Sequence, residues 1–262
     1  MALSKEKIRI LGDELYEAWK NAQAVTPITE RESDVSIEDA YHIQLQTIAR
    51  RVAAGERVVG KKVGVTSQAV MDMLKVDQPD FGHLLSGMVY NDGQTVSLAQ
   101  ALQPKGEGEI AFVMKHDLTG PGLTNADVLR ATDCVMPCFE LVDSRIQDWK
   151  IKIQDTVADN GSSFAFVLGD CAIDPRRIDL TTVGMTLEKN GEIIGTGAGA
   201  ASLGNPVNAV TWLANTLGQY GITLKAGEVI LSGSLSIMFP VAPGDAIRMS
   251  LGGIGACSAR FD

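Results

Sequence analysis

The chain has 262 residues, 45% of them hydrophobic, and a formal net charge of −9. This size and composition are typical of one large globular domain, and the sequence holds no apolar run of the ~20 residues that a membrane span requires. The negative charge and the lack of a Lys/Arg cluster argue against nucleic acid or a membrane as a partner. The N-terminal residues lack a secretory leader, which favours a cytoplasmic location.

The first 57 residues are predicted to form a helical region. Apolar side chains recur at helical spacing over residues 5–24. Ser36 followed by Asp39 resembles a capping box, and the second helix that it opens is expected to end near Gly55.

From Val58 onward, short strand-like segments replace the helical spacing, with further helices expected at residues 125–134 and 208–220. Lys189-Asn190-Gly191-Glu192 is typical of a hairpin turn. The sequence therefore predicts an α+β fold in which residues 1–57 form the helical region and residues 58–262 a β-rich, barrel-like domain, together one integrated unit.

Two adjacent lysines, Lys61 and Lys62, lie in the predicted strand that begins at Val58. Only one of them can point inward, because side chains alternate along a strand. An inward lysine near carboxylates can bind a substrate oxygen or transfer a proton, and the alternative is that both are solvated. Asp80 follows Pro79, and this stretch has the composition of a turn.

Glu107 and Glu109 are two residues apart at the start of a predicted buried strand, so their carboxylates share one face. Two carboxylates at the end of an apolar strand repel each other and are costly to desolvate, which favours a divalent cation between them. Gly106 and Gly108 keep the backbone open, which suits the close approach of a ligand. The alternative is a solvated turn before the strand.

Glu140 is the best candidate for a third ligand, because it is a lone charge within an apolar run. A buried carboxylate must be paired, protonated or bound to a metal. Three carboxylates suit Mg²⁺ or Mn²⁺ better than Zn²⁺. The alternative is a salt bridge to Arg145 or a lysine; Arg145 is also a cation that can organise the acidic cluster.

The cysteines and histidines offer little chemistry. Cys134 and Cys138 can be neighbours on a helix, but no second pair completes a zinc site. The chain has only 3 histidines, so acid–base chemistry rests on Lys, Asp and Glu. The loop of residues 159–163 offers hydroxyl and N–H groups that can hold a carboxylate or simply form a turn.

Several motifs together resemble one known family. They include Gly60-Lys61-Lys62-Val63-Gly64, Asp77-Gln78-Pro79-Asp80-Phe81-Gly82, Pro104-Lys105-Gly106-Glu107-Gly108-Glu109, Glu140-Leu141-Val142-Asp143-Ser144-Arg145 and Asp155-Thr156-Val157-Ala158-Asp159-Asn160. From about Leu11 to Phe261, the chain resembles the 2-hydroxypenta-2,4-dienoate (vinylpyruvate) hydratases of the meta-cleavage pathway of aromatic degradation. These hydratases belong to the hydratase/decarboxylase branch of the fumarylacetoacetate hydrolase superfamily.

The resemblance implies a metal-dependent hydro-lyase that converts 2-hydroxypenta-2,4-dienoate to 4-hydroxy-2-oxopentanoate. It implies that Glu107, Glu109 and Glu140 hold Mg²⁺ or Mn²⁺, that Lys62 and Asp80 are catalytic, and that Ser162 contacts the substrate. It also implies a homo-oligomer and an association with 4-oxalocrotonate decarboxylase. The chain departs from the family at Phe164, which is expected to reshape the substrate pocket.

Rival functions from three classes remain open. The nearest is 4-oxalocrotonate decarboxylase, a carboxy-lyase with the same fold and metal site, or a hydratase of a longer dicarboxylate dienol, which needs a further cation. A C–C bond hydrolase needs a histidine that activates water, and none is found at a matching position. A non-catalytic chain that stabilises the decarboxylase is the third class.

Overall fold

The computed structural model describes residues 2–74 and 76–262. Its helices are α1 (Lys5–Asn21), α2 (Ile28–Arg31), α3 (Ile37–Ala53), α4 (Gln68–Leu74), α5 (Asn125–Ala131), α6 (Ile153–Ala158) and α7 (Pro206–Gln219). Within the described residues, none of the helices combines the length and the apolar character that crossing a bilayer requires.

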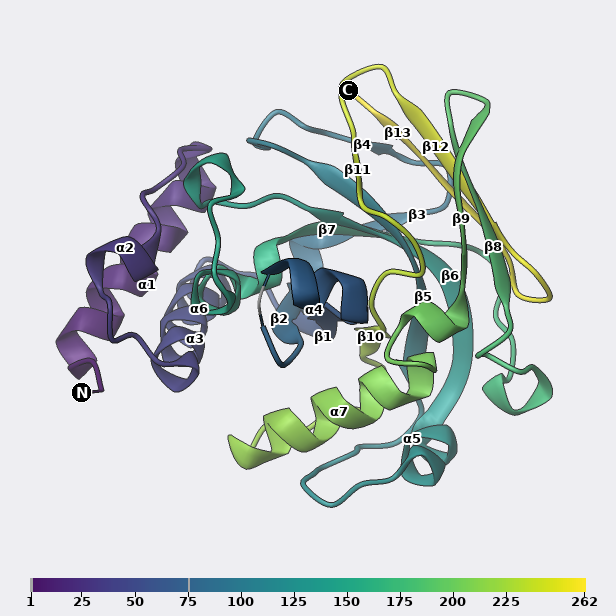
Figure 1. The fold of residues 1–262 in the computed structure, drawn as a ribbon, viewed down its shortest axis with the longest axis horizontal. Coiled ribbons are helices and arrows are strands. Elements are labelled where there is room, and N and C mark those ends of the chain that lie inside the picture. Colours follow the sequence, from purple (N-terminus) through teal and green to yellow (C-terminus); the bar gives the residue numbers. More distant parts are fainter. Residues whose placement is uncertain (1, 75) are drawn as a thin grey trace.

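Helices α1 and α3 pack against each other at one end of the molecule, and α3 also packs against α6 (Figure 1). Ser36 begins α3 with the expected capping box, in which the Ser36 hydroxyl and the Asp39 carboxylate each accept a backbone N–H. The division of the chain into residues 1–57 and 58–262 stays a prediction.

The larger sheet has eight strands in the order β2-β1-β10-β5-β6-β7-β3, with β11 paired to β5. Its strands are β1 (Val58–Gly64), β2 (Asp80–Leu85), β3 (Val89–Asn91), β5 (Lys105–Met114), β6 (Thr132–Val142), β7 (Ser163–Leu168), β10 (Val229–Leu231) and β11 (Phe239–Pro240). The sheet is strongly curved, and α4 lies in front of β1 and β2 (Figure 1).

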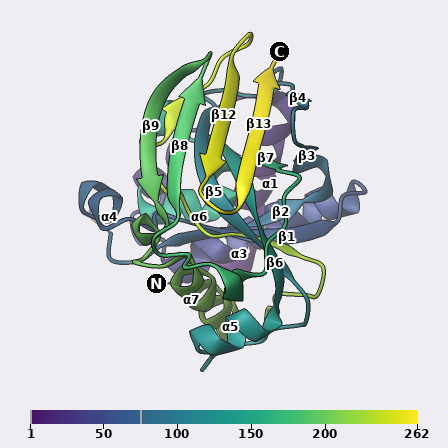
Figure 2. The same cartoon turned by 90° about the vertical axis from the view of Figure 1, so that its right-hand side faces the viewer.

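A second sheet of five strands packs against the larger one. Its order is β4-β13-β12-β8-β9, formed by β4 (Thr95–Val96), β8 (Gly184–Lys189), β9 (Glu192–Ala198), β12 (Ala246–Leu251) and β13 (Gly255–Phe261). Figure 2 shows β9, β8, β12 and β13 side by side. Asn190 and Gly191 make the expected hairpin turn, both with positive φ.

The α+β class and the helical region at the N-terminus are as predicted, although the described strands form two open sheets and not a closed barrel. The prediction for residues 125–134 was partly wrong, because α5 ends at Ala131 and Cys134 lies in β6. Cys134 and Cys138 are therefore not neighbours on a helix. Asp80 is not a turn residue, because it opens β2 opposite Gly64 of β1.

Candidate metal centre and active-site pocket

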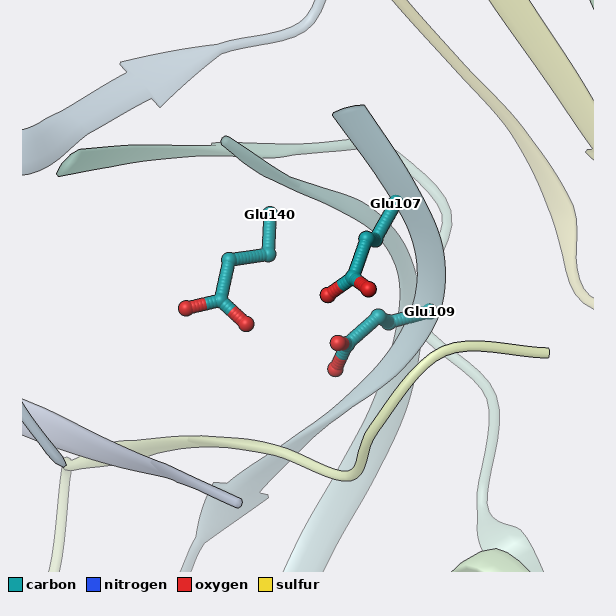
Figure 3. Close-up of side chains that lie close together, drawn as sticks. All are labelled: Glu107, Glu109 and Glu140. Atoms are coloured by element: carbon teal, nitrogen blue, oxygen red, sulfur yellow. The ribbon is translucent and has the colours of Figure 1, made fainter. Parts of the chain in front are cut away.

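The three glutamates converge on one face of the larger sheet. In the antiparallel pair β5–β6, Glu107 lies opposite Glu140 and Glu109 lies opposite Cys138. Strand alternation therefore turns all three acidic side chains to the same side. Their carboxylate groups each offer an oxygen within 4.8 Å of the others (Figure 3). The acidic triad, as we call Glu107, Glu109 and Glu140, thus has the size of a single-ion site.

The acidic triad is short of partners. Glu109 and Glu140 are both 0% exposed. One Glu109 oxygen accepts the Gly233 N–H at 2.7 Å, but Glu109 Oε1 and both oxygens of Glu140 accept no hydrogen bond from the described residues. Burial raises the pKa of Glu140 to about 8, and burial together with the neighbouring Glu140 raises that of Glu109.

Unpartnered buried oxygens of this kind fit a hard divalent cation. Leaving three buried oxygens without a donor is costly, and a cation ligated by oxygen would remove that cost. The donor set contains carboxylate oxygens alone, which suits Mg²⁺ or Mn²⁺. The residues present therefore fit the metal that the sequence led us to expect.

Lys62, and not Lys61, points toward the acidic triad. Lys62 Nζ lies 3.3 Å from Asp80 Oδ1 and 3.6 Å from Glu140 Oε2, and the side chain is buried. Burial lowers the pKa of Lys62, but the surrounding carboxylates outweigh burial and leave that pKa raised. Lys61 points to the opposite face, where it forms a buried ion pair with Glu228.

Gly64 makes room for the ion pair of Lys62 and Asp80. A Cβ at position 64 would lie 2.4 Å from Asp80 Oδ1 and 2.6 Å from Lys62 Nζ. Gly64 also lies directly opposite Asp80 in the β1–β2 pairing. Because of this crowding, only glycine lets the two side chains meet at this point.

Ser162 lies in a left-handed turn beside Lys62. Asn160, Gly161 and Ser162 all have φ between 53° and 58°. A Cβ at Gly161 would lie 3.0 Å from the end of the Lys62 side chain. Such a backbone is rare for residues other than glycine and persists only where the surroundings enforce it.

Arg145 enforces the turn; it does not serve the acidic triad. Its Nε donates to Asp159 Oδ1 at 2.6 Å, and its Nη1 donates to the Ser163 carbonyl at 3.1 Å. The Ser162 hydroxyl donates to Asp159 Oδ2 at 3.3 Å. The suggested roles of Arg145 as partner of Glu140 or organiser of the acidic cluster were therefore wrong: its guanidinium is used by the loop that carries Ser162.

A pocket of about 250 Å³ opens beside the acidic triad, of which Glu107 is part of the lining. Lys62, Asp80, Glu107, Gly161 and Ser162 contribute its polar lining. The rest of the lining is mostly apolar and comes from several elements; it includes Val65, Val70, Val142, Ile151 and Met238.

Lys105 and Trp149 also line this pocket, with the Lys105 ammonium 4.2 Å from the centroid of the Trp149 ring. Phe164, which was expected to reshape this pocket, lines a different one beside Trp19 and Tyr90.

Gly106 and Gly108 do not serve a ligand, contrary to expectation. A Cβ at Gly106 would lie 2.6 Å from the Phe239 ring, and one at Gly108 would lie 2.6 Å from Met185 Sδ. These contacts are on the face of β5 opposite the acidic triad, because the glycines alternate with the glutamates. The glycines therefore allow β11 and the second sheet to pack closely behind the site.

Sequence reasoning missed three residues of the site: Gly64, Gly233 and Lys105. Lys105 could have been predicted from the sequence, because it precedes Glu107 by two residues and so shares its face of the strand. The other two depend on tertiary contacts, since Gly64 faces Asp80 of another strand and Gly233 follows β10.

Comparison with known proteins gives consistent results. Residues 54–262 match the family model described as fumarylacetoacetate (FAA) hydrolase C-terminal. The chain is 64% identical, over 221 residues, to a 2-hydroxypent-2,4-dienoate hydratase of Pseudomonas putida; the match covers 84% of this chain and 100% of that protein. It is 55% identical to a 2-hydroxyhexa-2,4-dienoate hydratase of Comamonas testosteroni, over 98% of both chains.

Among solved structures, the chain resembles a 4-oxalocrotonate decarboxylase from Pseudomonas putida G7. The TM-score is 0.96 and the sequence identity 38%, with 99% of both chains covered. That protein was solved in complex with magnesium and adipate.

Proposed function

This chain belongs to the fumarylacetoacetate hydrolase family, and we infer that it is a hydro-lyase that adds water to 2-hydroxypenta-2,4-dienoate to give 4-hydroxy-2-oxopentanoate. The observation that supports this most strongly is the convergence of three carboxylates, two of them buried and with oxygens that accept no hydrogen bond, beside a pocket that also holds a lysine–aspartate pair. The product is a 2-oxo acid, a class of compound that chelates hard cations through its carboxylate and its 2-oxygen.

The acidic triad is proposed to hold the metal, Mg²⁺ or Mn²⁺, with Glu109 oriented by the Gly233 N–H. When bound, the cation supplies Lewis-acid stabilisation of the negative charge that develops on the 2-oxygen of the substrate. Magnesium is bound by the structural relative at 38% identity. The carboxylates of this chain also keep the base of the pocket polar, so the apolar end of the substrate has to lie against the apolar walls.

Lys62 and Asp80 are proposed to move the protons. The reaction needs a proton delivered to C5 of the dienol and the proton of its 2-hydroxyl removed, which gives the unsaturated 2-oxo acid. Water then adds at C4, which requires one proton removed from that water and one delivered to C3. The Lys62 ammonium and the Asp80 carboxylate are 3.3 Å apart at the pocket wall, so they offer one donor and one acceptor side by side. The Ser162 hydroxyl, also in the lining, is proposed to contact the substrate.

The acidic triad can be tested with the purified protein stripped of metal. We expect consumption of the dienol, followed by its ultraviolet absorbance, to stop without metal and to return with Mg²⁺ or Mn²⁺. Glu109→Gln should abolish turnover and prevent Mg²⁺ from raising the unfolding temperature, because a ligand that binds only the folded state stabilises it. Full turnover by the stripped protein would contradict the metal assignment.

Glu188→Gln is the matched control, because it removes a carboxylate of β8 that does not line this pocket. It should keep both the turnover and the stabilisation by Mg²⁺. If Glu109→Gln behaved like this control, Glu109 would not be a ligand.

The decarboxylase is the second candidate, favoured by the TM-score of 0.96 to a 4-oxalocrotonate decarboxylase. The hydratase ranks first because its named relatives are 64% and 55% identical, against 38% for the decarboxylase. Parallel assays of the isolated protein on the monocarboxylate dienol and on 4-oxalocrotonate separate the two. Activity on 4-oxalocrotonate alone would reverse the order.

We also propose that the protein is a cytoplasmic homo-oligomer that associates with 4-oxalocrotonate decarboxylase. In support, Ile193 on the edge strand β9 is 67% exposed, and an apolar edge strand of this kind favours pairing with another chain. Sedimentation of the protein alone and with the decarboxylase tests this assembly.

A further inference from the structure

Lys105 is a pocket cation to which the proposed chemistry gives no role. It opens β5 two residues before Glu107, so its side chain shares the face of the acidic triad. Its backbone is fixed on both sides, opposite Val142 of β6 and Pro240 of β11. Among the described residues, its ammonium has no carboxylate within the 4.0 Å of an ion pair.

Trp149 holds this ammonium in the pocket. The ammonium lies 4.2 Å from the centroid of the ring, and the ring N–H donates to the Gln103 carbonyl at 3.3 Å. Asp148 and Trp149 are both left-handed, with φ of 57° and 53°, a conformation that L residues rarely adopt. An aromatic face attracts a cation but accepts no strong hydrogen bond, so the N–H groups of Lys105 stay available to a ligand.

The charge balance of the site depends on Lys105. Asp80 and the acidic triad supply four carboxylates, and Lys62 supplies one ammonium near them. With a divalent cation bound, these groups would leave the site with one excess negative charge, which would repel an anionic substrate. Lys105 cancels that charge, because it is the remaining basic residue of the pocket lining among the described residues.

We propose that Lys105, held by Trp149, binds the C1 carboxylate of the substrate and so selects for 2-oxo acids and their enols. This inference rests on the proposed function for the identity of the ligand. Lys105 is one strand repeat, roughly 7 Å along β5, from Glu107, and so lies beside the chelated end of the substrate. The pocket walls formed by Val65, Val70 and Met238 are apolar and suit the hydrocarbon end.

The test is equilibrium binding of pyruvate to the full chain with saturating Mg²⁺, measured by calorimetry. Lys105→Met keeps the apolar stem over Trp149 but removes the charge, and we expect it to raise the pyruvate Kd by roughly tenfold or more. Lys105→Arg keeps the charge and should stay within about threefold of wild type. An unchanged Kd in Lys105→Met would overturn the proposal, as would failure of the wild type to bind pyruvate.

Two controls make the result specific. Lys115→Met removes the same charge just beyond the other end of β5, where Lys115 is exposed and paired with Asp133, and should leave the pyruvate Kd unchanged. The Mg²⁺ affinity measured without pyruvate should not weaken in Lys105→Met, since Lys105 is not a ligand. A weaker Mg²⁺ affinity would mean that Lys105 supports the acidic triad and not the substrate, against the proposal.

A second ligand shows whether Lys105 binds the C1 carboxylate or a distal carboxylate. The dicarboxylate 2-oxoadipate should lose the same factor as pyruvate in Lys105→Met, because both carry the same C1 carboxylate. A loss confined to 2-oxoadipate would assign Lys105 to a distal carboxylate and overturn the proposal. Wild-type protein that binds pyruvate through Lys105 but does not hydrate the dienoate would refute the proposed function alone.

Discussion

Gly64 shows how a residue without a side chain determines the chemistry of the pocket. Its missing Cβ is the space in which the Asp80 carboxylate and the Lys62 ammonium meet. Both atoms that a Cβ would displace are the ends of flexible side chains, and the Gly64 backbone does not have a positive φ. The fold can therefore accept a methyl group here by moving the ion pair apart.

Gly64→Ala is predicted to lower kcat by about 100-fold if Lys62 and Asp80 carry their proposed catalytic roles, because small displacements of catalytic groups carry costs of that size. The free energy of unfolding should change by less than about 1 kcal/mol, since only side-chain ends move. Steady-state kinetics and urea unfolding measure the two effects.

Gly184→Ala is the matched control for this prediction. Gly184 begins β8, and a Cβ there would meet nothing within 4 Å. This variant should keep wild-type kcat and stability. If Gly64→Ala were as active as Gly184→Ala, the pair of Lys62 and Asp80 would not need its observed geometry.

At the scale of residues, the sequence predicted the positions of the acidic side chains better than the glycines whose missing side chains make room for other groups. Glu107 and Glu109 follow from strand alternation, and Glu140 from a lone charge in an apolar run. The sequence alone did not decide whether Lys61 or Lys62 points inward. Lys61 points to the opposite face because its partner there is Glu228, which lies 167 residues away in the chain. No local pattern reports a partner at that separation.

At the scale of elements, the turn of residues 159–163 depends on a buried ion pair between its first residue, Asp159, and Arg145, which lies 14 residues earlier in the chain. Arg145 is 5% exposed and Asp159 is 3% exposed. Burial raises the pKa of Asp159 to about 6, even though Arg145 acts to lower it. Asp159 in turn accepts the hydroxyl of Ser162, so the ion pair places a residue of the pocket lining.

Arg145→Met is predicted to destabilise the fold by about 3–5 kcal/mol at pH 7.5, because it leaves the Asp159 carboxylate buried without its cation. Urea unfolding gives the value. In the double variant Arg145→Met/Asp159→Asn, part of this loss should return, because the amide carries no charge to desolvate. Equal losses of unfolding free energy in the single and double variants would show that the Arg145 guanidinium acts through its hydrogen bonds to backbone carbonyls and not through its charge.

Strand β5 shows the limit of prediction for an element. Its position and its inward glutamates follow from the sequence, but the role first given to Gly106 and Gly108 was wrong. A single strand carries no signal of what covers its outer face. Only the packing of Phe239 and Met185 shows that these glycines serve the contact with β11 and the second sheet.

At the scale of the whole molecule, His83 joins the helical region to the larger sheet. Its Nδ1 lies 2.9 Å from Gln44 Oε1 of α3. Gln44 Nε2 donates to the carbonyls of Phe81 and Val157, so Gln44 Oε1 is an acceptor and His83 Nδ1 carries the proton. Burial, with a smaller effect of Lys61, lowers the pKa of His83 to about 3.

This shift predicts acid sensitivity. The pKa of histidine in the unfolded chain is about 6.5, so below that pH the unfolded chain binds a proton that the folded one refuses. His83 should therefore lower the free energy of unfolding by about 2 kcal/mol between pH 7.5 and pH 5. Urea unfolding at both pH values should show that loss in the wild type.

His83→Gln supplies the comparison, because glutamine does not titrate. Between pH 7.5 and pH 5, the free energy of unfolding of the variant should fall by about 2 kcal/mol less than that of the wild type, even if the variant is less stable at pH 7.5. An equal loss in both proteins would show that His83 is not the group responsible.

The pairing of β5 with β6 sets Glu107 directly against Glu140. Like charges in that position oppose the strand contact that creates the site. Without a cation, this pairing opposes the ionisation of the two facing carboxylates. A slip of one residue would turn the glutamates of the sliding strand away from the pocket. Supplying Mg²⁺ during refolding should therefore speed the pairing of β5 with β6, because a cation between the facing carboxylates favours the one register that brings them together.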